Sequence, residues 1–214
     1  METANNTKTN ECLDPQHPHP IVVLISGRGS NLQSIIDAAN ADLRVEIRAV
    51  ISNKSDAFGL ERARQAGIET RVIEHQSFPK REDFDGALQA VIEQFQPRLV
   101  VLAGFMRILT PAFVAHFKNR LINIHPALLP LLPGLDTHER AIAEGFKEHG
   151  ASVHFVTEEV DAGPIIIQAR VPVLPGDTPE TLAARVLVEE HRILPQAIRW
   201  FMEGKLSPNA DDGQ

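Results

Sequence analysis

The stretch that decides the fold is residues 21–39, which read IVVLISGRGSNLQSIIDAA. Its first five residues are apolar and mostly β-branched, which is typical of a strand covered on both faces. A turn containing two glycines follows, and apolar residues then recur at helical spacing at Leu32, Ile35, Ile36 and Ala39. A strand, a tight turn and a helix in this order predict the first unit of an α/β sheet.

The same alternation continues along the chain. Further apolar runs predict strands at residues 45–51, 70–73, 98–102, 121–124, 151–156 and 164–171. Helical patterns lie between several of them, and Thr178 followed by Pro179 predicts the start of the last helix. We therefore predict the α/β class, with a doubly wound, mostly parallel, Rossmann-like sheet of about seven strands in a single domain. In such sheets ligands bind at the carboxyl ends of the strands.

Composition sets limits on the partners. The chain has 214 residues, 43% of them hydrophobic, which is enough for one domain with a substantial core. Its net charge of −7 argues against nucleic-acid and anionic-membrane partners. No apolar run is long enough to span a bilayer, and no secretory signal is visible, so we expect a cytoplasmic protein. The polar ends predict a tail at 1–19, a domain at 20–206 and a tail at 207–214. The lone cysteine, Cys12, lies in the first tail, and we predict that its thiol is inert.

The glycine turn is the first candidate site. Its residues, Ser26 to Asn31, follow a strand and open a helix, so backbone N–H groups at the helix start would face a ligand. The turn lacks the Gly-Lys-Ser/Thr of a Walker loop and the third glycine of the dinucleotide fingerprint. We therefore favour one bound phosphate over a pyrophosphate. The alternative is a plain tight turn capped by Ser30.

Asn123 and His125 are the second candidate site. They are two residues apart at a strand end, so their side chains point to the same face, and Pro126 favours an extended His125. An amide donor beside an imidazole suits an oxyanion that grows on an attacked carbonyl, and the imidazole can transfer a proton near neutral pH. The alternative is a polar strand end whose histidine bonds the backbone.

Asp161 lies in a turn-rich loop between two predicted strands. If that loop folds over the strand ends, its carboxylate would orient and charge His125; otherwise it is an ordinary turn residue. Arg107, after another strand end, is either a ligand-binding or a surface arginine. The remaining histidines show no metal-ligand spacing, and we predict structural or surface roles for them, with His154 a hydrogen-bonded interior residue. No nucleophile elbow is present, which favours direct transfer over a covalent intermediate.

Taken together, the motifs resemble the phosphoribosylglycinamide formyltransferase family, folate-dependent enzymes of purine synthesis. The resemblance runs from Pro20 to about Lys205. It is carried by residues 25–31, 52–59, 102–109, 123–130, 154–157 and 161–164. It implies transfer of the formyl group of 10-formyltetrahydrofolate to the amine of 5′-phosphoribosylglycinamide in de novo IMP biosynthesis, without a metal.

The resemblance also implies roles for individual residues. The catalytic group would be Asn123, His125 and Asp161, with Asp161 raising the pKa of His125. The substrate would contact Gly29, Ser30, Asn31, Gly104, Pro126 and Glu190. The folate cofactor would contact Arg81, Met106, Arg107, Ile108, Leu109, Asn123, Val156, Thr157 and Asp161. The partners would be small molecules only, with the protein a monomer or a homodimer.

Other functions remain open at this stage. A formyltetrahydrofolate hydrolase resembles this domain but usually carries an extra domain before it and lacks the phosphate loop. A methionyl-tRNA formyltransferase would need a C-terminal RNA-binding domain and a basic surface. A non-catalytic binder of a phosphorylated metabolite would need the glycine turn but not Asn123, His125 and Asp161. A nicotinamide oxidoreductase is disfavoured by the incomplete fingerprint.

Overall fold

A computed structural model describes residues 17–206 of the chain. Its strands are β1 (His19–Ile25), β2 (Val45–Ser52), β3 (Thr70–Val72), β4 (Leu99–Leu102), β5 (Leu121–His125), β6 (Glu148–Phe155) and β7 (Ile165–Pro172). Its helices are α1 (Ser30–Ala41), α2 (Phe58–Gln65), α3 (Arg81–Gln94), α4 (Pro111–His116), α5 (Thr137–Ala143) and α6 (Pro179–Met202), with a short 3-10 helix, η1 (His75–Ser77).

The seven strands form one sheet in the order β3-β2-β1-β4-β5-β6-β7. The strands from β1 to β5 pair in parallel, whereas β6 and β7 pair antiparallel. The predicted mostly parallel, doubly wound sheet is therefore confirmed. The chain reverses its direction across the sheet between β1 and β4, and this switch point is where such sheets bind ligands.

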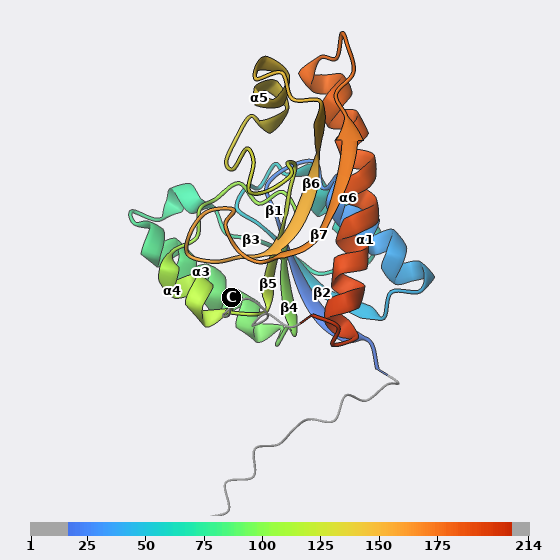
Figure 1. Cartoon of the computed structure of the whole chain (residues 1–214). Helices are drawn as coiled ribbons and strands as arrows, with labels where there is room; N and C mark the ends of the chain where they lie inside the picture. The colour runs from blue at the N-terminus through green and yellow to red at the C-terminus, as the bar shows by residue number, and fades with distance from the viewer. Residues whose placement is uncertain (1–16, 207–214) are drawn as a thin grey trace, which may run out of the picture.

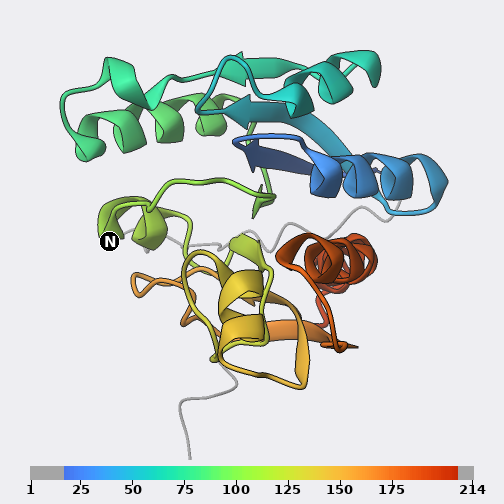
Figure 2. The same ribbon diagram turned by 90° about the horizontal axis from the view of Figure 1, so that it is seen from above.

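Helices cover both faces of the sheet. The layers are visible in Figures 1 and 2, with α1 and α6 on one side and α3 and α4 on the other. The side chains of β1 alternate between the two cores: Ile21, Val23 and Ile25 pack in the core that includes α1 and α6, and Val22 and Leu24 pack in the core that includes α3 and α4. Burial on both faces explains why this strand is apolar throughout.

Helix starts follow the sequence closely where the caps are strong. Thr178 caps α6 by accepting a hydrogen bond from the backbone N–H of Thr181, and Pro179 is the first helical residue, as predicted. The helices α2, α4 and α5 were not predicted, because 8, 6 and 7 residues are too few to show a clear helical period.

The predicted tails lie almost entirely outside the described residues. The first strand begins at His19, one residue inside the predicted N-terminal tail. The expectations for residues 1–16, including Cys12, and for 207–214 fall outside the described residues. Within 17–206, no helix combines the length and the apolar character needed to cross a membrane.

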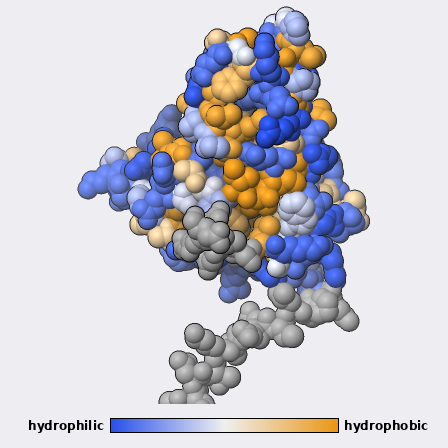
Figure 3. Space-filling view, in the orientation of Figure 1, coloured by the Kyte–Doolittle hydropathy of each residue, from blue (hydrophilic) through white to orange (hydrophobic). Residues whose placement is uncertain are grey.

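The strand β7 lies at one edge of the sheet, so only β6 pairs with it. Its side chains are accordingly less buried than those of the central strands, and Ile165 is 45% exposed. Figure 3 shows apolar residues gathered on the face of the molecule where β6 and β7 lie.

Candidate active site

The glycine turn leaves the start of α1 uncapped by its own side chain. The N-cap residue is Gly29 in the left-handed conformation (φ 71°), and Ser30 is the first helical residue, so Ser30 does not cap the helix. The N–H groups of the first helical turn therefore remain available to an anion.

Gly29 also lies against the first turn of α2. A Cβ atom on Gly29 would clash with the Cα atom of Gly59, and Gly59 donates its N–H to the carbonyl oxygen of Gly27 at 2.9 Å. The backbones of Gly29 and Gly59 are thus in close contact and hold the turn against α2, and a side chain at either position would prevent this contact.

A cavity of about 350 Å³ opens at this turn, at the switch point between β1 and β4. The structure therefore brings Gly104 and Met106, which follow β4, to the predicted phosphate residues. Lys54 and Ala103 also reach the cavity, and neither is among the site residues predicted from the sequence. The lining consists of Ser26, Gly27, Arg28, Gly29, Ser30, Asn31, Lys54, Ala103, Gly104 and Met106.

Ser26 connects the loops around the cavity. Its hydroxyl donates to Oδ1 of Asn53 at 2.5 Å and accepts the backbone N–H of Met106 at 2.7 Å. Ser26 follows β1, Asn53 follows β2, and Met106 lies beyond β4. Both side chains are buried, so these hydrogen bonds hold three strand ends in a fixed relation.

Asn31 and Glu190 meet at the back of the turn. The Asn31 amide donates to Oε2 of Glu190 at 2.6 Å, which joins α1 to α6. Burial raises the pKa of Glu190, and the hydrogen bond from Asn31 opposes the rise. The Oδ1 atom of Asn31 is buried and has no hydrogen-bond partner among the described residues, so its capacity to accept a hydrogen bond is unused there.

The second cluster forms around Asp161. Its Oδ2 atom lies 3.4 Å from Nδ1 of His125, and its Oδ1 atom lies 3.6 Å from Nε2 of His154. The amide of Asn123 lies 3.3 Å from Nε2 of His154, and Nε2 of His125 lies 3.0 Å from the carbonyl oxygen of Leu132. The loop before β7 thus folds back onto β5 and β6, and Asp161 reaches His125 as expected.

His154 is the residue of this cluster that sequence reasoning missed. It is 2% exposed, and its Nδ1 atom lies 2.8 Å from the carbonyl oxygen of Phe155, so the prediction of a hydrogen-bonded interior histidine is confirmed. Its contacts with Asn123 and Asp161 were not predicted. They depend on the antiparallel register that sets His154 opposite Asn123, and no sequence pattern gives that register.

The protonation of His125 differs from the expectation. Burial lowers the pKa of His125 below its ordinary value, and the Leu132 carbonyl and the Asp161 carboxylate only partly offset this. The expected increase from Asp161 is present as an opposing effect, but the net direction is down. Burial alone would raise the pKa of Asp161, yet hydrogen bonds from His154 and from the N–H of Gly134, with the charge of His125, lower it. A neutral imidazole therefore faces a carboxylate near neutral pH.

The position of Asp161 depends on Gly163. A Cβ atom on Gly163 would collide with the carbonyl group of Phe155 at the end of β6, and the Phe155 N–H donates to the carbonyl oxygen of Pro164 at 2.9 Å. Asp161 itself has φ 54°, a left-handed conformation that aspartate tolerates better than most residues. Close backbone packing thus fixes the loop that carries the carboxylate.

The loop after β4 has the features of a ligand-binding surface. Met106 is 63% and Ile108 is 59% exposed, which is unusual for large apolar side chains. The guanidinium of Arg107 lies over the ring of Phe84 at 6.0 Å, and its Nε atom is buried with no hydrogen-bond partner among the described residues. Leu109 differs, because its side chain belongs to the core on the α3 and α4 side.

The other residues predicted to contact ligands do not line the cavity at the glycine turn. Arg81 is exposed at the first position of α3, and in the described chain its side chain makes no hydrogen bond or ion pair with the loop after β4. Val156 and Thr157 are half-buried just beyond β6, and Pro126 is half-buried just beyond β5.

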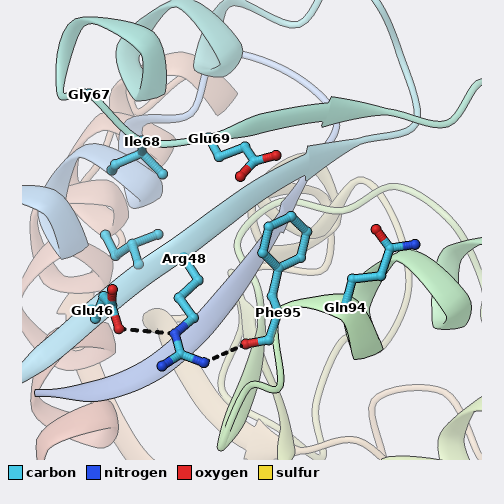
Figure 4. A pocket seen from close by; sticks show the side chains of 8 residues that line it. Glu46, Arg48, Gly67, Ile68, Glu69, Gln94 and Phe95 are labelled. Carbon is cyan, nitrogen blue, oxygen red and sulfur yellow. Dashed lines mark hydrogen bonds and ion pairs between the residues drawn. The ribbon is translucent and has the colours of Figure 1, made fainter.

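A larger pocket, of about 510 Å³, lies at the amino ends of the strands, opposite the end that holds the glycine turn. It is lined by residues near the amino ends of β2 and β3, and Figure 4 shows that its one arginine, Arg48, is already paired with Glu46 and with the backbone of Phe95. The Nε atom of Arg48 lies 3.0 Å from Glu46, and Nη1 donates to the carbonyl oxygen of Phe95 at 2.9 Å. It offers a ligand neither a free charge nor an imidazole, so the cavity at the glycine turn is the better candidate.

Comparisons with known proteins identify the family of the chain. The protein-family model described as "Formyl transferase" matches residues 19–198. The phosphoribosylglycinamide formyltransferase of Escherichia coli (strain K12) is 55% identical over 199 residues, which cover 91% of this chain and 94% of that one. The structure of the enzyme of that name from Coxiella burnetii has a TM-score of 0.86 at 58% identity, covering 89% of this chain and 90% of the other. Glycinamide ribonucleotide transformylase 1 from Symbiobacterium toebii has a TM-score of 0.88 at 47% identity, covering 93% and 95%.

Proposed function

Because the chain belongs to the formyl transferase family, we propose that it catalyses the reaction for which its relatives are named. It transfers the formyl group of 10-formyltetrahydrofolate to the amine of 5′-phosphoribosylglycinamide, giving formylglycinamide ribonucleotide and tetrahydrofolate in purine biosynthesis. The observation that carries the proposal is the juxtaposition of two sites. A cavity lies beyond β1 and β4, and the cluster of Asn123, His125 and Asp161 lies on the neighbouring strand β5 and on the loop between β6 and β7.

The ribonucleotide would bind along the first of these sites. Its phosphate takes the N–H groups and side chains of Gly29, Ser30 and Asn31 at the start of α1. Its glycinamide end extends past Gly104 toward Pro126, near the buried Glu190. The Asn31–Glu190 hydrogen bond supports a place for Glu190 in the site, because it brings α6 against the start of α1.

The folate would occupy the surface between the loops after β4 and β6. Exposed Met106 and Ile108 offer apolar contact, and the buried Nε atom of Arg107 has a hydrogen bond left to donate. Val156 and Thr157 would line the opposite side, and the backbone at Leu109 would contribute rather than its buried side chain. Arg81, at the start of α3, would complete the surface.

The reaction is a direct transfer. The substrate amine attacks the formyl carbon, which forms a new N–C bond and turns the carbonyl oxygen into an oxyanion. The Asn123 amide donates a hydrogen bond to that oxyanion. Neutral His125 takes a proton from the attacking amine, and the resulting imidazolium, held by Asp161, stabilises the oxyanion. The oxyanion then re-forms the C=O bond, the C–N bond to the folate breaks, and His125 gives its proton to the departing folate nitrogen.

A spectrophotometric assay with 10-formyltetrahydrofolate tests the proposal. Deformylation that requires the ribonucleotide, and that His125→Ala abolishes, is the expected result. His116→Ala is the matched control, because His116 lies at the end of α4 and pairs with Glu93 of α3 instead of Asp161. Deformylation that is equally fast without the ribonucleotide would instead indicate the hydrolase, and none under either condition would indicate a binding protein.

A further inference from the structure

The cavity at the glycine turn carries positive charge in an acidic chain. The whole sequence has a net charge of −7, yet the cavity lining includes the cations Arg28 and Lys54 and no carboxylate. Arg28 belongs to the turn itself. Lys54 lies on a different segment, the loop after β2, and it has no role in the proposed substrate and folate contacts.

The backbone at Lys54 is held firmly. The hydroxyl of Ser52 donates to the carbonyl oxygen of Lys54 at 2.8 Å and accepts its N–H at 3.0 Å. Ser52 is fully buried, and the next residue, Asn53, is 2% exposed and accepts the hydroxyl of Ser26. Two buried, hydrogen-bonded residues therefore fix the point from which the lysine side chain leaves the wall of the cavity.

The Lys54 ammonium is not committed elsewhere. Within residues 17–206, no carboxylate lies within ion-pair distance of it. The neighbouring Arg62 is committed, because it donates to the carbonyl oxygen of Arg28 and to the side chain of Gln33. The arginine of the other pocket is likewise paired, with Glu46.

The charge of the ligand favours a cation on the wall of the cavity. A phosphate monoester carries close to two negative charges at neutral pH. A helix N-terminus supplies about half a positive charge, so the start of α1 leaves most of the phosphate charge without a partner. A lysine is suited to a phosphate as a compact point charge.

We propose that Lys54 is the counter-charge for the substrate phosphate, facing the start of α1 across the cavity, and that Ser52 and Asn53 position it. This inference rests on the proposed function for the identity of the phosphorylated ligand. It gives a role to residues 52–54, which belong to the segment 52–59 that carries part of the family resemblance.

Three variants test the proposal. Lys54→Met keeps the length of the side chain and removes its charge, and Lys54→Arg keeps the charge. Lys118→Met removes an exposed lysine just before the amino end of β5, whereas the cavity lies beyond the carboxyl ends of β1 and β4. We expect Lys54→Met to raise the KM for the ribonucleotide about tenfold and to leave the KM for the folate donor unchanged. Lys54→Arg should restore most of the affinity, and Lys118→Met should match the wild type.

Salt provides a readout of the charge itself. The KM for the ribonucleotide should rise with ionic strength in the wild type, and less steeply in Lys54→Met, because one screened interaction is gone. A ribonucleotide KM within twofold of the wild type in Lys54→Met would overturn the proposal. A Lys54→Arg variant as weak as Lys54→Met would overturn it too, because shape rather than charge would then be responsible.

Binding of ribose 5-phosphate, measured by calorimetry, separates this proposal from the proposed function. Weaker binding in Lys54→Met, about tenfold, supports the phosphate contact even if no formyl transfer is seen in the wild type. Equal binding in the two proteins removes Lys54 from the site while leaving the formyl transfer intact.

Discussion

His125 and Asp161 come from segments far apart in the sequence, and their side chains meet with 3.4 Å between Nδ1 and Oδ2. The opposite ring nitrogen of His125 lies 3.0 Å from the carbonyl oxygen of Leu132. Both nitrogens therefore face hydrogen-bond acceptors, and a neutral ring can donate to only one of them. The site is arranged to favour the imidazolium once a proton becomes available, while burial keeps the resting ring neutral.

Asn123→Ala should lower turnover by about a hundredfold or more, because it removes a donor from the developing oxyanion. Steady-state kinetics with both substrates measure the change. Asn40→Ala, on an exposed position of α1, is the control and should behave as the wild type. Near-normal turnover in Asn123→Ala would exclude the oxyanion role.

Gly163→Ala should reduce activity strongly, because the new methyl group cannot fit against the carbonyl group of Phe155 and the loop that carries Asp161 must shift. Gly86→Ala is the matched control: its Cβ would meet no atom within 4 Å, and alanine in the interior of α3 should stabilise the protein by up to about 1 kcal/mol. Turnover and thermal unfolding are measured for both variants. Unchanged turnover in Gly163→Ala would mean that the position of Asp161 does not matter.

Glu190→Ala should destabilise the fold by about 1–3 kcal/mol, because it leaves the buried Asn31 amide without its acceptor. Glu190→Gln retains an acceptor oxygen in the same place and should cost much less. Chemical denaturation gives the free energy of unfolding for each. Equal losses in the two variants would show that the carboxylate charge, and not the hydrogen bond, stabilises this contact.

Acid should destabilise the protein through His149. Burial, with the nearby His138 and His125, lowers the pKa of His149 from 6.5 to about 4 in the folded state. The unfolded chain therefore binds a proton first as the pH falls. The stabilisation is complete above pH 6.5, declines toward pH 4 and is lost below it, at a total cost of up to about 3 kcal/mol.

Thermal unfolding between pH 4 and pH 8 measures this dependence. His149→Gln should flatten the curve in the acid range, because the group that titrates is gone. A variant with the same acid dependence as the wild type would assign the effect to other histidines.

The sequence was sufficient for most of the sheet. Strands such as β1 and β4 are apolar on both faces, so each run of β-branched residues has one plausible structure. The glycine turn and the Asn123–His125 pair could also be predicted, because both depend only on residues close together in the sequence. Short helices such as α4 were missed because they lack a full period.

What could not be predicted depends on contacts between distant segments. His154 reaches Asn123 only through the pairing of β5 with β6, and Lys54 reaches the cavity only because β2 lies beside β1. The fall in the pKa of His125 has the same origin, because its burial is created by packing and is absent from the local sequence.

The reversal of strand order between β1 and β4 has a consequence for how this site can change over time. Two loops leave the sheet in opposite directions there, so the hollow between them is a product of the path of the backbone. Substitutions of the residues that line the hollow change which ligand binds, but they do not move the hollow itself. Related chains can therefore come to bind different ligands while the binding site stays at the same position in the fold.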